Sequence, residues 1–173
     1  MRKLKADEIE CRVSQVSAKG CSLLLYKTAR VDRAILDEEF GTMSWQNDFK
    51  LIDGKMYGGI GVYSNDLSEW IWKWDCGIES REDEEGNEKK GEASDSFKRA
   101  GFRWSIGRAL YTSPFIWIGA DKANIKPGKN GKPTCYDKFI VEKIAYSEDG
   151  RRIVGVSIIN ETKRERAFVW QAK

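Results

Sequence analysis

The chain has 173 residues, of which 40% are hydrophobic and 33% are charged, and its formal net charge is +3 at pH 7. This length suits one domain, and the mean hydropathy is −0.58. No stretch approaches the roughly 20 apolar residues that cross a membrane, and residues 1–20 are too charged for a signal peptide. We therefore expect a cytoplasmic protein. The chain has no histidine, which excludes Ser-His-Asp and Cys-His catalysis and His-ligated zinc or haem.

The four cysteines, Cys11, Cys21, Cys76 and Cys135, are far apart and form no C-x-x-C pair. Structural zinc sites usually contain such pairs, so the sequence disfavours a zinc site. In a reducing cytoplasm we expect four free thiols in or near the core, no metal and no cofactor.

Charge is unevenly distributed along the chain. Residues 1–92 carry 14 basic and 19 acidic side chains, whereas residues 93–173 carry 16 basic and 8 acidic ones. The segment from Lys98 to Lys138 contains nine Lys or Arg residues and only two acidic residues, Asp121 and Asp137. Such a concentration is typical of a protein that binds a polyanion, and equally of a solvated basic face.

The N-terminal part predicts two helices and a strand. Ala6–Val16 is compatible with a short helix, and Cys21–Tyr26 is a compact apolar run typical of a strand. Thr28 is suited to cap a helix that continues to Phe40, and Gly41 stands where a glycine ends a helix.

Three strands follow. Apolar residues alternate with polar ones over Met43–Leu51, Asp53-Gly54 is a tight-turn dipeptide, and Met56–Tyr63 is the returning strand. The third strand, Glu69–Cys76, places Trp70, Trp72, Trp74 and Cys76 on one face. Aromatic stripes can stack nucleic-acid bases, but more often they pack under a helix, which is the interpretation we favour.

The long helix expected over about Gly91–Tyr111 has two unlike sides. One stripe is apolar and small, and comprises Ala93, Phe97, Ala100, Trp104 and Tyr111. The other side carries Lys98, Arg99 and Arg103, with Phe102 and Ile106 among them. Gly101 and Gly107 indicate close approach of another backbone or a break near the helix end.

The remaining residues return to a β pattern. We expect an apolar strand over Pro114–Gly119 and a flexible basic loop over Asp121–Thr134. Lys138–Tyr146 and Arg152–Ile159 are expected to form a hairpin around Glu148-Asp149-Gly150, and Arg166–Trp170 a last strand. The fold class is therefore α+β: an antiparallel three-stranded β-β-β sheet packed by a long helix, with a C-terminal β-hairpin appendage. We divide it into a core, 1–113, and a β extension, 114–173, within one globular unit.

Two enzymatic motifs are imitated without being completed. Gly86 and Gly91 have the glycine spacing of a P-loop, but Glu92 stands where the lysine must be, which excludes an ATPase. Asp75 followed by Glu88 and Lys90 imitates the acid-then-E-x-K pattern of metal nucleases, yet Glu88 lies in a polar stretch rather than on a buried strand. We expect no catalytic residues and no enzyme activity.

The stretch from Tyr26 to Tyr111 resembles the core of the Rad-fifty-two-type single-strand annealing proteins, which include phage members. A helix after Arg30 ends in Phe40-Gly41, and Trp45 follows four residues later. A glycine-rich aromatic strand comes next. The last element is Lys90-Gly91-Glu92-Ala93 leading into Asp95-Ser96-Phe97-Lys98-Arg99-Ala100, which is similar to the family's E-A-x-x-D-G-x-K-R-A helix. Departures are Thr42, where an aromatic is expected, the acidic stretch from Glu79 to Glu88, and the added C-terminal hairpin.

The resemblance implies ATP-independent binding of single-stranded DNA and annealing of complementary strands in homologous recombination and DNA repair. It implies a homo-oligomeric ring, arc or helical filament with DNA in a basic groove, located in the bacterial host cytoplasm if phage-encoded. A phage exonuclease and host recombination proteins are candidate partners, and a membrane is not. The DNA-binding residues it implies are Arg30 (with Arg33 as the alternative), Lys98, Arg99, Arg103, and, for an outer contact, Lys89 and Lys90.

Two other functions stay open. One is a plain single-stranded DNA-coating protein, for example an OB-like barrel, which the long mid-chain helix disfavours. The other is the metal-dependent nuclease, which EDTA would inhibit.

Overall fold

A computed structural model describes residues 1–78, 88–128 and 131–172, with the side chains of 88–90 left out of the description. The chain divides into two compact units. The helix–sheet unit comprises Met1–Lys3 and Lys27–Arg108, and the six-stranded unit comprises Leu4–Tyr26 and Ala109–Lys173. Both contain strands, and the helices belong to the first, so the α+β class is confirmed.

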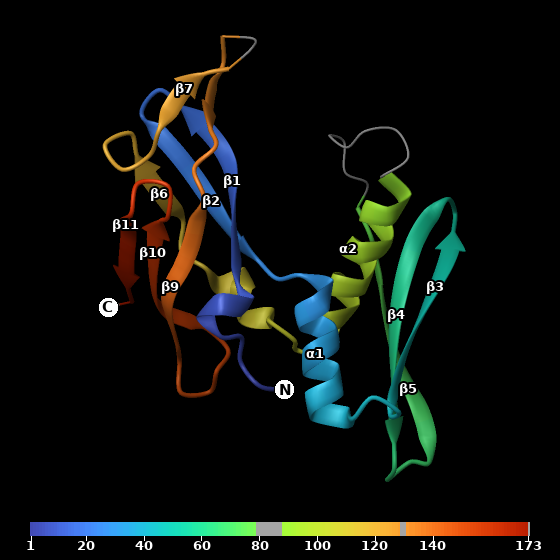
Figure 1. The fold of residues 1–173 in the computed structure, drawn as a ribbon. Coiled ribbons are helices and arrows are strands. Elements are labelled where there is room, and N and C mark those ends of the chain that lie inside the picture. Colours follow the sequence, from blue (N-terminus) through green and yellow to red (C-terminus); the bar gives the residue numbers. More distant parts are fainter. Residues whose placement is uncertain (79–87, 129–130, 173) are drawn as a thin grey trace. The chain divides into compact units, whose positions relative to one another are not determined.

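The helix–sheet unit contains an antiparallel sheet in the order β3-β4-β5, together with two helices (Figure 1). Its elements are α1 (Ala29–Phe40), β3 (Trp45–Ile52), β4 (Lys55–Ser64), β5 (Glu69–Cys76) and α2 (Glu88–Arg103). The predicted three-stranded sheet with its helix is thus present. Asp53 and Gly54, which join β3 to β4, have φ values of 50° and 75°, as the predicted tight turn requires.

α2 packs on one face of this sheet, and Gly58 lets it approach closely. A Cβ on Gly58 would lie 2.8 Å from the backbone nitrogen of Phe97, so only glycine fits there. Phe97 and Ala100 are buried on α2, and Ile60 is buried beneath them on β4. The indole nitrogen of Trp104 donates a hydrogen bond to the Ile60 carbonyl oxygen at 3.0 Å.

The tryptophans of β5 lie on the opposite face. Because Ile71, Lys73 and Asp75 point to the α2 side, Trp70, Trp72 and Trp74 must point away from it. Lys73 confirms this orientation, since its Nζ lies 4.1 Å from the Trp104 ring centroid. Our expectation that the tryptophan stripe packs under the helix is therefore wrong. The close approach at Gly58 and the ion pairs of Asp75 fix α2 on the other face.

α1 begins and ends as predicted. The Thr28 hydroxyl accepts a hydrogen bond from the backbone nitrogen of Val31, and Gly41 follows the helix with a φ of 81°. Ile35 and Leu36 are its buried apolar residues. The indole nitrogen of Trp45 donates to Asp37 at 2.7 Å, which ties the start of β3 to the last turns of α1.

α2 is shorter than predicted. It ends at Arg103, and Ser105 and Gly107 follow with φ values of 70° and 67°. Residues in this left-handed region cannot continue a right-handed helix, so the chain turns into a 3₁₀ segment, η2 (Arg108–Thr112). As a result Tyr111, expected on the buried stripe, is 67% exposed, whereas Ile106, expected on the basic side, is buried.

The six-stranded unit is an antiparallel sheet in the order β11-β10-β9-β1-β2-β6, and β11 also approaches β6, so the sheet is nearly closed. Its elements are η1 (Ala6–Glu8), β1 (Glu10–Ser17), β2 (Gly20–Tyr26), β6 (Ile116–Gly119), β7 (Ile125–Pro127), β8 (Pro133–Cys135), β9 (Phe139–Tyr146), β10 (Ile153–Asn160) and β11 (Glu165–Gln171). Here β1 pairs with β2 (Figure 1).

The N-terminal helix predicted over Ala6–Val16 is therefore wrong. The segment is one 3₁₀ turn followed by β1, because pairing with β2 and β-branched Val13 and Val16 favour a strand. The predicted strands at the C-terminal end are confirmed, but the flexible loop expected over Asp121–Thr134 is wrong, because this segment contains β7 and pairs it with β8. However, the hairpin β9–β10 is part of the six-stranded sheet, a larger structure than the appendage we expected. No helix of the described residues is long and apolar enough to cross a membrane.

Candidate nucleic-acid interface

Three of the predicted DNA-binding residues lie together on α2. Lys98 and Arg99 are half-buried, and Arg103 is 58% exposed. The Nζ of Lys98 lies 3.8 Å from a carboxylate oxygen of Asp95, one turn earlier on the helix. A single helix therefore presents three cations that are accessible to an external anion.

Asp75 on β5 already contacts two of these cations. Its carboxylate oxygens lie 3.3 Å from the Nε of Arg99 and 3.0 Å from the Nε of Arg103. Both contacts use Nε, and within the described part of the chain neither guanidinium makes another side-chain hydrogen bond. The terminal nitrogens of both arginines are therefore the atoms with which a phosphate could hydrogen-bond. The sequence alone gave Asp75 a different role, as a candidate metal ligand.

Arg30 and Arg33, the two alternatives on α1, have different surroundings. Arg30 is exposed at the second residue of the helix, which packs beside α2. The guanidinium of Arg33 lies over the Phe97 ring, 4.5 Å from its centroid. Both side chains are exposed, so either arginine is accessible to an external anion, and the alternative stays open.

A buried ion pair supports the backbone beneath Lys98. The Nζ of Lys27 donates hydrogen bonds to the two carboxylate oxygens of Asp32, at 2.5 and 2.6 Å, and to the Lys98 carbonyl oxygen at 2.9 Å. Burial lowers the pKa of Lys27, and burial raises the pKa of Asp32 to about 6 against the opposing effect of the lysine charge. Gly101 leaves room for this pair, because a Cβ there would lie 3.1 Å from the Asp32 carboxylate. No spacing rule had singled out these two residues.

Other predicted residues lie outside the described part. Lys89 and Lys90 belong to the first turn of α2, but their side chains are not among those described, and neither is that of Glu88. Of the acidic stretch from Glu79 to Glu88, residues 79–87 lie outside the described residues. Among the described residues, no group of three or more Cys, Asp or Glu side chains could hold a metal ion.

The four cysteines are free thiols, as predicted. Burial raises the pKa of the Cys11 thiol to about 12, with a smaller contribution from the charge of Glu10. Burial raises the pKa of Cys21 to about 12 as well. Both thiols are therefore protonated at neutral pH and are poor nucleophiles.

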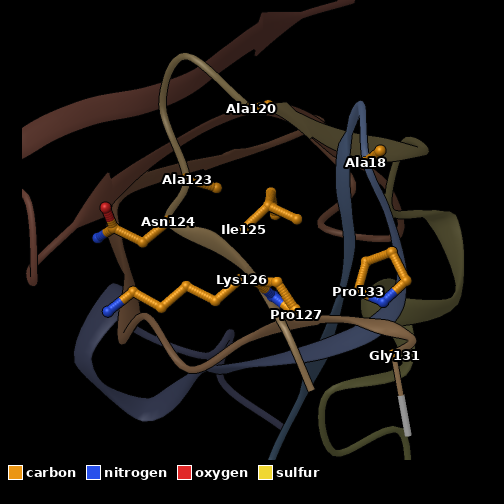
Figure 2. Close-up of a pocket in the computed structure, with 9 residues that line it drawn as sticks. All are labelled: Ala18, Ala120, Ala123, Asn124, Ile125, Lys126, Pro127, Gly131 and Pro133. Atoms are coloured by element: carbon orange, nitrogen blue, oxygen red, sulfur yellow. The ribbon is translucent and has the colours of Figure 1, made fainter. Parts of the chain in front are cut away.

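A hollow of about 490 Å³ lies in the six-stranded unit, beside the β7–β8 hairpin (Figure 2). Figure 2 shows Ile125 in the middle of this hollow, with Asn124 and Lys126 at its edge. The rest of its lining consists of alanines, prolines and a glycine, namely Ala18, Ala120, Ala123, Pro127, Pro133 and Gly131. This lining has no converging titratable groups, so the basic residues of α1 and α2 are the stronger candidate site.

Comparisons with protein-family models and with curated proteins give no match to this chain.

Proposed function

We propose that this protein binds single-stranded DNA and anneals complementary strands without nucleotide hydrolysis. The observation that carries the proposal is the set of cations on the helix–sheet unit. Lys98, Arg99 and Arg103 follow one another along α2, and Arg30 is exposed on the neighbouring α1. Annealing requires that phosphates be held while base edges stay free, and side-chain cations on a helix meet that requirement.

The further parts of the proposal rest on the resemblance. It implies that copies of the chain assemble into a ring, arc or filament, so that the cations of successive copies form one DNA track. It also implies recombination and repair as the process served, with a phage exonuclease or host recombination proteins as partners.

A single-stranded DNA-coating protein is the second candidate function. The nearly closed six-stranded sheet favours it, because small antiparallel barrels are a common scaffold for binding single strands. Such a protein would bind DNA tightly and would slow annealing rather than accelerate it. The metal-dependent nuclease is the third, and would need Asp75, which already contacts two arginines.

The test is an annealing assay with two complementary labelled oligonucleotides, in EDTA and without nucleotide. We expect the wild-type protein to accelerate annealing and the Lys98→Ala/Arg99→Ala variant to lose that acceleration. The variant should also bind single strands with a flatter salt slope, by about 0.7 for each lost phosphate contact.

The matched control is Arg151→Ala/Arg152→Ala, an adjacent pair of exposed cations in the turn between β9 and β10. It removes the same charge from the other unit, and we expect it to anneal like the wild type. Tight binding without acceleration would support the coating protein. An unchanged salt slope in the α2 variant would refute the proposed site, and cleavage of the oligonucleotides in Mg²⁺ would support the nuclease.

A further inference from the structure

The face of the three-stranded sheet that points away from α2 is rich in aromatic rings. Register places these side chains on one surface, because Gly59 pairs with Trp74, Gly61 with Trp72 and Tyr63 with Trp70. We call this surface the aromatic face, and it comprises Tyr57, Tyr63, Trp70, Trp72 and Trp74. Trp70 and Tyr63 are each 38% exposed, and their rings meet edge to face with centroids 5.5 Å apart.

Two glycines let the indoles lie against the sheet. A Cβ on Gly59 would come within 2.6 Å of the Trp74 ring, and a Cβ on Gly61 within 2.7 Å of the Trp72 ring. Each indole therefore covers the bare backbone of the neighbouring strand. The rings of Trp72 and Trp74 are nearly parallel, with an interplanar angle of 21° and centroids 5.3 Å apart. Glycine at both positions thus lets the two indoles stack on each other along the strand.

The charges on the aromatic face are mainly positive. The Nζ of Lys50 lies 4.1 Å from the centroid of the Trp74 ring, and Lys55 extends from the same face at the start of β4. Alternation along β3 places one carboxylate, Asp48, on this side. Two cations beside a row of rings are complementary to a strand of stacked bases with phosphates along one edge.

We propose that the aromatic face binds single-stranded DNA by stacking bases along its row of indoles, chiefly on Trp72 and Trp74, with Lys50 moving off the Trp74 ring to pair with a phosphate and Lys55 near the next phosphate. This inference rests on the proposed function and adds a second, base-contacting site to the cations of α2. Stacking engages the flat surfaces of bases and leaves their pairing edges free, so it is compatible with annealing. A second copy of the chain is the other possible occupant. Lysine is depleted at the centres of protein–protein interfaces, and Lys50 lies directly over a central ring, so the observations favour DNA.

The experiment compares binding of an oligothymidylate with binding of an abasic oligonucleotide of the same length. The abasic strand has the same phosphates but no bases to stack. We expect the wild-type protein to bind oligothymidylate more tightly. In Trp74→Leu, which keeps an apolar side chain, affinity for oligothymidylate should fall about fivefold or more, while affinity for the abasic strand and the salt slope stay unchanged.

Two further variants keep the test decisive if Trp74→Leu folds poorly. Trp70→Leu changes a more exposed ring of the same face and should show the same selective loss in smaller degree. Trp117→Leu is the matched control. It is 39% exposed, its ring stacks with Phe115 at 6.4 Å, and it belongs to the six-stranded unit. This control should leave both affinities unchanged, and thermal unfolding of each variant checks its folding.

The outcomes separate this inference from the proposed function. If the wild type binds both strands equally, or if Trp70→Leu and Trp74→Leu affect both equally, base stacking on this face is refuted while DNA binding stands. A changed sedimentation coefficient with an unchanged affinity ratio would assign the aromatic face to contacts between copies and would refute our inference. If the wild type binds neither strand, the proposed function fails, and this inference fails with it.

Discussion

Asp75 should limit the affinity of this protein for DNA. Its carboxylate lies 3.3 and 3.0 Å from the Nε atoms of Arg99 and Arg103, so one negative charge is shared between two cations of the proposed site. Asp75→Asn removes that charge and nearly preserves the shape of the side chain. The Oδ1 atom that accepts a hydrogen bond from the backbone nitrogen of Cys76, at 2.8 Å, can be kept. The perturbation is therefore electrostatic, and the variant should fold.

The size of the effect follows from counterion release. Each phosphate neutralised on a single strand adds about 0.7 to the slope of log affinity against log salt concentration. Removing Asp75 adds one unit of positive charge to the site, which corresponds to about one more neutralised phosphate, so the slope steepens by about 0.7. Over a roughly fourfold rise in salt, this change lowers affinity by about 2.6-fold relative to the wild-type trend. The lost ion pairs are partly exposed, so each should contribute at most about 1 kcal/mol to the free energy of unfolding.

The assay is fluorescence anisotropy of a labelled oligothymidylate over a range of salt concentrations. We expect tighter binding at low salt and a steeper slope for Asp75→Asn. The matched control is Glu142→Gln, which adds the same unit of charge by freeing Arg166 in the six-stranded unit. An equal change in both variants would mean that net charge alone is responsible. An unchanged slope in Asp75→Asn would refute our assignment of Arg99 and Arg103 to phosphate contacts.

Two predictions concern stability. Trp104→Ala should lower the free energy of unfolding by about 3 kcal/mol in urea denaturation, since the half-buried ring and the bond to the Ile60 carbonyl oxygen are lost; a loss no larger than that of Trp117→Ala would contradict this packing. Hydrogen bonds from Arg166 and, less strongly, Ser157 lower the pKa of Glu142 to about 2. A lowered carboxyl pKa stabilises the fold above the unfolded value of about 4.3, and this stabilisation disappears as pH falls through about 2. Glu142→Gln should therefore unfold at a lower temperature than the wild type at neutral pH. Its unfolding temperature should also change less than that of the wild type as the pH falls from about 4.3 to about 2, as thermal unfolding at several pH values would show.

Local chemistry in the sequence was sufficient for the elements that chain neighbours determine. Thr28 and Gly41 define α1, because capping and left-handed termination involve only nearby backbone groups. Asp53-Gly54 predicted the β3–β4 turn, since only a few residue types accept the positive φ values at both positions. Alternation also placed the three tryptophans of β5 on one face. The same local pattern identified Lys98, Arg99 and Arg103 as cations of one helix.

Contacts between distant residues decided the rest. Alternation separates the two faces of β5 but does not say which of them a helix will cover; here Gly58 and the ion pairs of Asp75 hold α2 on the face without tryptophan. Strand pairing made β1 a strand and joined it to β9 in one sheet, because backbone hydrogen bonds with a partner far along the chain outweigh weak local propensity. Local patterns along the chain were thus enough to predict the helix α1, the β3–β4–β5 order and the cations of the candidate site. Long-range packing brings Asp75 to two of those cations and leaves the tryptophans uncovered by α2, because neither contact involves residues that are neighbours in the chain.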